Sequence, residues 1–202
     1  MSTRIVFATG NAGKMREIRE ILEDLGVPVV SMKEAGISAD IVEDGKTFAE
    51  NALIKARAVH ELCGDIVLAD DSGLEVDAMD KAPGIYSARW LGEETPYEVK
   101  NQSIIDNLKG LSGAERSARF VCAVAAVFPD GQEAQTLGVI EGQIAHQPAG
   151  AGGFGYDPIF YLPERGMTTA EITEEEKNAI SHRGKALTAM KPILKEWLEK
   201  RV

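Results

Sequence analysis

The chain has 202 residues, of which 44% are hydrophobic and 27% charged, so its size and composition fit one globular domain with a substantial core. Its formal net charge of −10 argues against a DNA- or RNA-binding protein, because an acidic surface repels a polyanion. No apolar run reaches the roughly 20 residues that cross a bilayer, and no secretory signal is evident, so we expect a single domain over residues 1–202 in the cytoplasm with no membrane partner.

The N-terminal segment alternates strand and helix patterns. A strand is predicted over residues 4–8, and a helix with apolar residues recurring on one face is predicted over residues 14–25. Gly26 ends that helix, and a second strand follows over residues 27–31. The next stretch, residues 32–45, is acidic and has the composition of a loop.

Capping boxes open two predicted helices in the middle of the chain, over residues 47–62 and 95–108. In such a box a Ser or Thr side chain accepts the amide three residues on, and a Glu at that position reaches back. Between these helices, residues 66–69 form a short apolar strand pattern. We expect this strand to deliver Asp70 and Asp71 at its carboxyl end.

A long β-hairpin is predicted in the second half of the chain. Residues 118–128 and 133–144 have strand patterns and are separated by the turn sequence Pro-Asp-Gly. A glycine-dense stretch, residues 148–158, leads to a short strand at 159–162.

The C-terminal segment is predicted to be helical. A capping box at residues 173–176 opens it, it extends to residue 200, and Pro192 is expected to kink or interrupt it. Strands that alternate with helices, followed by a long hairpin, are typical of an α/β fold with a mixed sheet.

The first candidate site is the glycine-rich turn ATGNAGKM, which begins at Ala8. A P-loop requires Gly, four residues and then Gly-Lys-Ser/Thr. Here Ala8 stands at the first position and Met15 follows Lys14, so a P-loop is excluded. Backbone amides at a helix N-terminus together with a lysine can still bind phosphate. The alternative is an ordinary turn shaped by Asn11 and Gly13, and this stretch alone does not separate the two.

The second candidate is Gly150–Gly155, which matches the pattern G-x-G-x-x-G. A dinucleotide site needs a strand before this pattern and a helix after it, and neither is predicted here. What remains is a loop that presents Phe154, Tyr156 and Asp157. An aromatic residue on such a loop can stack on a base, whereas the alternative is that these aromatics belong to the core.

Adjacent carboxylates at Asp70 and Asp71 follow an apolar strand, where ligand sites of α/β sheets lie. They can hold magnesium or polarise a water molecule. Neighbours on an extended strand point to opposite faces, so the two need not share one role. The alternative is a turn that begins with Asp and ends at Gly73. Glu43 and Asp44 are candidate partners, although their acidic loop by itself resembles solvated surface.

Positive charge comes from two further places. Lys55 shares a helix face with Asn51, four residues earlier, although a solvated lysine is the ordinary alternative. Lys177, His182 and Arg183 form the densest cationic cluster of this acidic chain and can donate to an oxo group or a phosphate. Together with the turn, the carboxylates and the aromatic loop, these residues fit a nucleotide polyphosphate with Mg²⁺.

This set of motifs resembles the inosine triphosphate pyrophosphatases, a family that hydrolyses non-standard purine nucleoside triphosphates. Five blocks and one further match carry the resemblance, and they follow the family's order along the whole chain. They are Thr9–Lys14, Thr47–Ala52 with Lys55–Ala56, Ala69–Leu74, Gly152–Pro158 and Ser181–Gly184, with Ala82–Arg89 as the further match.

The resemblance implies an elongated α/β fold, in which helices flank a long mixed sheet and the site lies in a central cleft between two lobes. It implies hydrolysis of ITP, dITP or XTP to the nucleoside monophosphate and pyrophosphate, which cleanses the nucleotide pool. It also implies a requirement for Mg²⁺ and assembly as a homodimer. Ile85, Tyr86 and Trp90 are candidates for the dimer interface, but they fit the core equally well.

By motif position, the resemblance assigns the substrate-binding residues. Those that grip the triphosphate are Thr9, Gly10, Asn11, Ala12, Gly13 and Lys14. Those that contact the nucleotide are Ser72, Phe154, Gly155, Tyr156, Asp157, Lys177, His182 and Arg183. Phe154 is expected to stack on the purine, and His182 and Arg183 are expected to donate to its 6-oxo group.

The resemblance also assigns the catalytic and metal-binding residues. Asp71 is the expected base and a metal ligand, and Lys55 and Asp70 are expected to support the phosphates and the metal. Glu43 is the expected second metal ligand, with Asp44 as the alternative. The alternative function, from another class, is a nucleotide-binding module that senses nucleotides without hydrolysing them, in which the carboxylates are structural.

Overall fold

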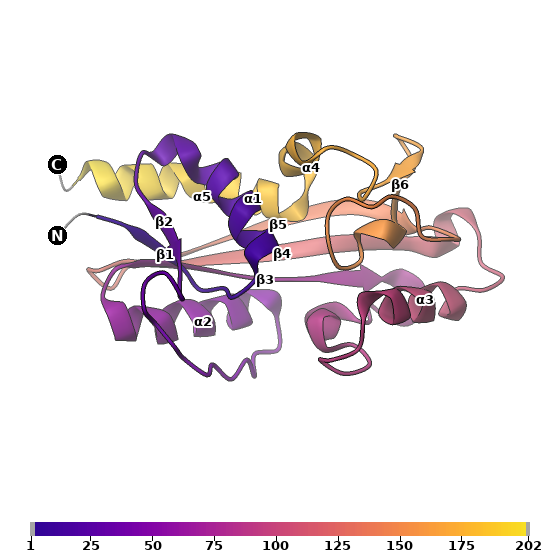
Figure 1. Ribbon diagram of the computed structural model, residues 1–202, viewed down its shortest axis with the longest axis horizontal. Helices are drawn as coiled ribbons and strands as arrows, with labels where there is room; N and C mark the ends of the chain where they lie inside the picture. Colours follow the sequence, from indigo (N-terminus) through magenta and orange to yellow (C-terminus); the bar gives the residue numbers. More distant parts are fainter. Residues whose placement is uncertain (1–2, 201–202) are drawn as a thin grey trace. The chain divides into compact units, whose positions relative to one another are not determined.

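A computed structural model describes residues 3–200 of the chain. Within these residues, seven strands form one sheet in the order β2-β1-β3-β4-β5-β6-β7 (Figure 1). The strands are β1 Ile5–Phe7, β2 Val29–Ser31, β3 Ile66–Val76, β4 Ser117–Val127, β5 Glu133–Ile144, β6 Phe160–Leu162 and β7 Met167–Thr168. Strand β1 pairs in parallel with β2 and β3, whereas β6 pairs antiparallel with β5 and β7. The predicted α/β fold with a mixed sheet is confirmed.

Five α-helices accompany the sheet in the described part of the chain. They are α1 Ala12–Leu22, α2 Phe48–Cys63, α3 Tyr97–Asn107, α4 Glu174–Ile180 and α5 His182–Glu199. A 3-10 helix, η3, covers Gly84–Arg89. None of the helices between residues 3 and 200 is both long enough and apolar enough to span a bilayer.

Contacts between residues divide the chain into two compact units. The first unit comprises residues 1–71, 122–138 and 182–202, and the second comprises residues 72–121 and 139–181. The expected single domain over residues 1–202 and the expected cleft between two lobes stay predictions.

The first unit is built around β1, β2 and β3 with helices on both faces. Helices α1 and α5 lie side by side on one face, and α2 covers the other (Figure 1). Ile5 and Phe7 of β1, which alternate with Val6, pack with Ile18 of α1 and Leu187 of α5 in a single buried cluster. Because side chains alternate along a strand, this pattern directs each apolar residue of β1 to one of two covered faces.

The second unit has its own core beneath α3. Leu74 of β3, Ile104 of α3 and Ile159 are fully buried in it. The rings of Phe120 and Phe160 lie 4.3 Å apart between centroids. Burial of these large apolar side chains supplies the main favourable term for folding of this unit.

Strand β3 is longer than predicted. It continues through Asp70 and Asp71 to Val76, so the predicted end at residue 69 and the alternative of a turn at Gly73 are both wrong. Burial continues beyond the charged pair, with Leu74 and Val76 fully buried, and this keeps the strand in the sheet. The two carboxylates therefore lie in the middle of a strand, beyond the end of its parallel neighbour β1.

The capping predictions met mixed outcomes. The box at residues 173–176 is confirmed in full, with both reciprocal bonds present. Thr47 caps α2 as predicted, but the carboxylate of Glu50 accepts the amide of Lys46 instead of reaching back to Thr47. The box at residues 95–98 is wrong, because the Thr95 hydroxyl donates to the carbonyl of Leu91 and the helix begins later.

The C-terminal helical region is interrupted at Ser181, which has an extended backbone and separates α4 from α5. Pro192 does not interrupt it, because α5 is continuous through that residue. The start of α5 lies close against β5: a Cβ added to Gly138 would lie 2.0 Å from the carbonyl oxygen of His182. Only glycine permits this approach of helix to strand.

Candidate functional site

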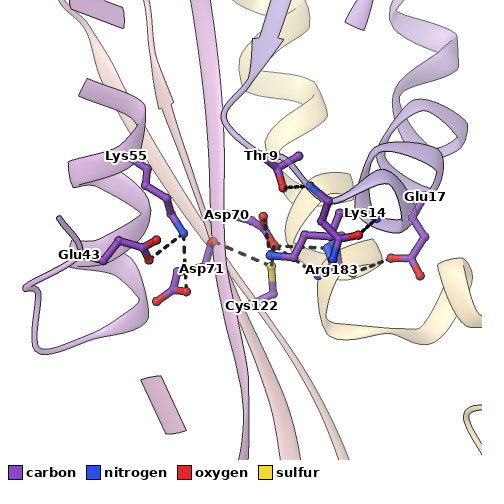
Figure 2. Close-up of polar contacts among 11 residues, drawn as sticks. Thr9, Lys14, Glu17, Glu43, Lys55, Asp70, Asp71, Cys122 and Arg183 are labelled. Atoms are coloured by element: carbon purple, nitrogen blue, oxygen red, sulfur yellow. Dashed lines mark hydrogen bonds and ion pairs between the residues drawn. The ribbon is translucent and has the colours of Figure 1, made fainter. Parts of the chain in front are cut away.

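Asp70 and Asp71 point to opposite faces of β3, as the alternation of a strand requires (Figure 2). Each carboxylate has its own set of partners within the first unit. We call Lys14, Glu17, Asp70 and Arg183 the Asp70 cluster, and Glu43, Asn51, Lys55 and Asp71 the Asp71 cluster. The two clusters differ in how their carboxylates are held.

The Asp70 cluster is a buried ion-pair network. Both carboxylate oxygens of Asp70 lie 3.1 Å from Nζ of Lys14, and Oδ2 lies 3.3 Å from the guanidinium of Arg183. Nη1 of Arg183 also donates to Glu17 at 2.5 Å. Burial opposes ionisation of Asp70, but the cations of Lys14 and Arg183 outweigh it and hold its pKa below the usual range. Asp70 is thus ionised at neutral pH and anchors two cations.

In the Asp71 cluster a single ammonium serves two carboxylates. Nζ of Lys55 lies 2.9 Å from Glu43 Oε2 and 3.7 Å from Asp71 Oδ1. Nδ2 of Asn51 donates to Asp71 Oδ2 at 3.1 Å. Burial raises the pKa of Asp71 and the charge of Glu43 adds to the rise, so the opposing effects of Lys55 and Asn51 are outweighed. A carboxylate with a raised pKa beside a lysine is a candidate general base.

Helix α2 and the loop before it arrange this cluster. Asn51 and Lys55 lie one helical turn apart and both reach Asp71, which confirms the predicted shared face. The amide of Gly45 donates to Asn51 Oδ1 at 2.9 Å, and a Cβ at Gly45 would lie 2.6 Å from that same oxygen. Close contact between the loop and α2 therefore holds Glu43 beside Lys55.

The Asp71 cluster fits a divalent cation that also binds phosphate. Glu43 and Asp71 share one ammonium, so together they carry more negative charge than Lys55 neutralises. Between residues 3 and 200 no group of three or more His, Cys, Asp or Glu side chains could enclose a metal ion. Mg²⁺ does not need one, because it binds through one or two carboxylates and completes its shell with water and substrate phosphates. Asp44, by contrast, is exposed.

The glycine-rich turn forms the N-terminus of α1. Oδ1 of Asn11 accepts the amide of Lys14 at 3.1 Å, and the amide of Asn11 donates to Thr9 Oγ1 at 3.2 Å. The first turn of a helix leaves the amides of Ala12 and Gly13 without intrahelical acceptors. The turn therefore combines an internal cap with amides suited to an anion.

The aromatic loop belongs to the second unit. Oδ2 of buried Asp157 accepts the amide of Phe154 and Nζ of Lys177, both at 2.7 Å. Oδ1 of Asp157 accepts the hydroxyl of Thr169 at 2.8 Å. Nζ of Lys177 lies 4.7 Å from the centre of the Phe154 ring, within range of a cation–π contact. Three predicted site residues are thus brought together, with Asp157 as their brace.

The remaining predicted residues are placed as follows. Tyr156 is buried and its hydroxyl donates to the carbonyl of Ser87, so it braces the loop from within. Gly155 follows Phe154 in the loop with a φ of +68°, and Ser72 lies half-buried on β3. His182 begins α5 in the first unit, and the contact expected between His182 or Arg183 and a purine stays a prediction.

Arg183 differs most from its expected surroundings. Its guanidinium is buried between Asp70 and Glu17, which favours a role in fixing Asp70. Sequence reasoning missed Glu17, which is 4% exposed. The available signal was its spacing, since Glu17 lies three residues after Lys14 and therefore on the same helix face.

Comparison with known proteins extends over nearly the whole chain. The model of the Ham1 family matches residues 5–193. A dITP/XTP pyrophosphatase of Streptomyces coelicolor is 46% identical over 198 residues, which cover 97% of this chain and 99% of the relative. The dITP/XTP pyrophosphatase of Bacillus subtilis is 45% identical over 190 residues, covering 94% and 96% of the two chains.

Solved structures agree with the sequence relatives. A HAM1 protein from Coxiella burnetii superposes with a TM-score of 0.86 at 41% identity, covering 96% of this chain and 99% of the other. The nucleoside-triphosphatase / dITP/XTP pyrophosphatase from Mycobacterium abscessus superposes with a TM-score of 0.74 at 41% identity, covering 93% and 98%. The family resemblance drawn from the motifs is thereby confirmed.

Proposed function

The chain belongs to the Ham1 family, and on that premise we propose that it hydrolyses dITP, XTP and ITP to the nucleoside monophosphate and pyrophosphate, cleansing the nucleotide pool. Relatives named dITP/XTP pyrophosphatase cover nearly the whole chain. The observation that carries the proposal is Asp71, a carboxylate with a raised pKa that Asn51 and Lys55 hold beside Glu43.

In the proposed reaction Asp71 takes a proton from a water molecule. The water oxygen attacks the α phosphorus, and the bond from that phosphorus to the bridging oxygen of pyrophosphate breaks. Asn51 and Lys55 hold the carboxylate of Asp71 in place for this proton transfer. Lys14 and the amides that open α1 stabilise the negative charge of the departing pyrophosphate.

Mg²⁺ is the proposed cofactor. Glu43 and Asp71 would hold it, and when bound it would neutralise phosphate charge. Asp70 is less suited as a ligand, because its oxygens already accept from Lys14 and Arg183. Asp44 is less suited than Glu43, since Lys55 directs Glu43 toward Asp71.

Base recognition is proposed for the aromatic loop. Phe154 stacks on the purine, and Lys177, whose Nζ lies 4.7 Å from the centre of that ring, is the donor that we assign to the 6-oxo group of hypoxanthine or xanthine. The donation to this group that was predicted for His182 and Arg183 stays a prediction. Adenine presents an amino donor at this position, so a site built from donors would leave buried polar groups unpaired. Strong selection against ATP and dATP follows.

The decisive experiment is identification of products. The purified protein is incubated with ITP, dITP, XTP, GTP and ATP in the presence of Mg²⁺, and the products are resolved by phosphorus NMR. Inosine monophosphate with pyrophosphate supports the proposal. A diphosphate with inorganic phosphate would indicate another kind of triphosphatase, and binding without turnover would favour the alternative of a nucleotide sensor.

We also propose a homodimer in the cytoplasm, with no nucleic-acid or membrane partner. Tyr86 is 56% exposed, Leu91 53% and Val99 52%, so apolar side chains of the second unit are available for a partner copy. Ile85 and Trp90 are only partly exposed. Cys63 and Cys122 are free thiols, which suits a reducing compartment. Light scattering tests the dimer, and a monomer at micromolar concentration would contradict it.

A further inference from the structure

Asn101 of α3 is a buried polar residue that the proposed reaction does not use. It is 4% exposed, and its Nδ2 donates to the carbonyl oxygen of Gly155 at 3.1 Å. Its Oδ1 is buried without a hydrogen-bond partner among the described residues. An unpaired buried oxygen is costly, so an apolar side chain would suit helix packing better. The asparagine is therefore explained by the bond to Gly155.

Tyr97 holds the same point of the loop from the same helix. Its ring meets the ring of Tyr156 edge-on, with centroids 5.3 Å apart and an interplanar angle of 88°. A Cβ at Gly155 would lie 3.5 Å from Cε1 of Tyr97, so the ring covers the left-handed turn of the loop. Tyr156 in turn donates to the carbonyl of Ser87.

A buried lysine secures Tyr97. Nζ of Lys100 donates to the carbonyl of Ala88 at 2.6 Å and lies 4.9 Å from the centre of the Tyr97 ring. Lys100 is 1% exposed, so its ammonium is held inside the second unit. Helix α3 and the 3-10 helix η3 thus form one rigid support behind Gly155 and Tyr156.

The backbone next to Phe154 is fixed at two atoms. Its own amide donates to Asp157 at 2.7 Å, and the carbonyl of the following residue, Gly155, accepts from Asn101. The first partner, Asp157, follows the loop residue in the sequence, and the second, Asn101, precedes it by about fifty residues. Together they restrain the backbone at Phe154 and at the residue that follows it.

We propose that Asn101 is a positioning residue for purine binding: its bond to Gly155 orients Phe154, and so it sets affinity for the base and leaves affinity for the phosphates unchanged. The inference rests on the proposed binding of a purine by Phe154. Tyr97 also helps to position Phe154, through its contacts with Gly155 and Tyr156.

The test compares Asn101→Leu with Asn107→Leu. Leucine has nearly the shape of asparagine and lacks the donor. Asn107 stands on the same helix, is exposed, and donates to the Ser103 carbonyl, so it controls for the same chemical change away from the loop. Titration calorimetry measures the binding of inosine monophosphate and of inorganic pyrophosphate separately, in the presence of Mg²⁺.

For Asn101→Leu we expect binding of inosine monophosphate to weaken about tenfold, the size of one lost hydrogen bond. Binding of pyrophosphate should stay within about twofold, and the KM for ITP should rise with kcat nearly unchanged. Asn107→Leu should match the wild type. Tyr97→Leu should shift the same measurements in the same direction, which covers the case in which Asn101→Leu does not fold.

Equal weakening of both probes would overturn the inference, because it would indicate a general structural defect. Unchanged binding of inosine monophosphate would overturn it as well. These probes do not require turnover, so the outcome is independent of product identification. If Asn101→Leu weakens only the binding of inosine monophosphate while the wild type releases no pyrophosphate from ITP, the proposed reaction is refuted and the inference stands.

Discussion

At the scale of single residues, Asp70 and Asp71 show how one strand gives two identical side chains opposite properties. Cations on the face of α1 and α5 lower the pKa of Asp70, whereas burial raises the pKa of Asp71 on the face of α2. The first carboxylate stabilises the fold and the second is suited to proton transfer. Their substitutions should therefore have different consequences.

Asp71→Asn should lower turnover of ITP by about 10²- to 10⁴-fold, the usual contribution of a general base.

The Asp71→Asn variant should also be at least as stable as the wild type at pH 7. A carboxyl whose folded pKa is raised above the unfolded value of 3.8 contributes stability only below that pH and loses it as pH rises through the folded pKa. At pH 7 the buried, ionised Asp71 therefore destabilises the folded state, and replacement by neutral asparagine removes this cost. Steady-state kinetics and thermal unfolding check both statements, and near-normal turnover would remove Asp71 from the chemistry.

Asp70→Asn should destabilise the protein by about 3–5 kcal/mol at pH 7, because it removes the buried carboxylate that Lys14 and Arg183 share and leaves Arg183 paired with Glu17 alone. The folded pKa of Asp70 is depressed, so its stabilising contribution is present above 3.8 and is lost as pH falls toward the folded value. Urea unfolding should accordingly show a difference from the wild type that shrinks on acidification below 3.8. Asp40→Asn, at an exposed carboxylate, is the control; an equal loss in both variants would contradict the buried pairing.

At the scale of elements, the start of α5 is positioned by its contact with β5. The hydroxyl of Thr136 donates to the carbonyl of Ala186 at 2.8 Å, and Gly138 lies directly against His182. The next residue of α5, Arg183, completes the Asp70 cluster. A strand of the hairpin thus sets where a distant helix presents its first charged side chain.

Gly138→Ala should displace the start of α5, because the new methyl group would lie 2.0 Å from the carbonyl oxygen of His182. We expect a destabilisation of about 1–3 kcal/mol from overpacking, together with a fall in turnover as Arg183 moves from Asp70. Urea unfolding and kinetics measure the two effects. Leu137→Ala, at the exposed neighbouring position of β5, is the control. A Gly138→Ala variant as stable and active as the wild type would show that this contact is not constraining.

At the scale of the whole molecule, the chain places its chemistry in two units with separate cores. The first contains the carboxylates and lysines suited to phosphate and metal, and the second contains the braced aromatic loop suited to a base. With a net charge of −10, the protein repels nucleotides at long range. The local cations and the proposed Mg²⁺ are therefore essential for binding the triphosphate.

The stability of the protein toward global unfolding should show whether Mg²⁺ binds, even when no substrate is turned over. Pyrophosphate with Mg²⁺ at about 100 times its Kd should stabilise the wild type by about 2.7 kcal/mol, and removal of the metal with a chelator should reverse most of this gain. Glu43→Gln should lose the Mg²⁺-dependent part, and its neighbour Asp44→Asn should retain it. Thermal unfolding gives the measurement; the reverse pattern would identify Asp44 as the ligand.

Local patterns determined much of this protein from sequence alone. The strands of the hairpin, the capping box at residues 173–176 and the shared face of Asn51 and Lys55 depend on residues a few positions apart, so helix and strand periodicity predicts them. The motif set likewise identified the family. The predicted length of β3 was too short, because Asp70 and Asp71 end the apolar pattern of the strand. The partners that allow these charges inside a strand lie elsewhere in the chain, so the local sequence does not show them.

Tertiary structure alone decided the environments of the charged groups. Arg183 meets Glu17 across 166 residues of sequence, and Asn101 meets Gly155 across 54. No local period encodes such pairs, because they depend on how elements pack and how far each side chain is removed from water. Desolvation and neighbouring charge, which raise the pKa of Asp71 and lower that of Asp70, exist only once the chain has folded.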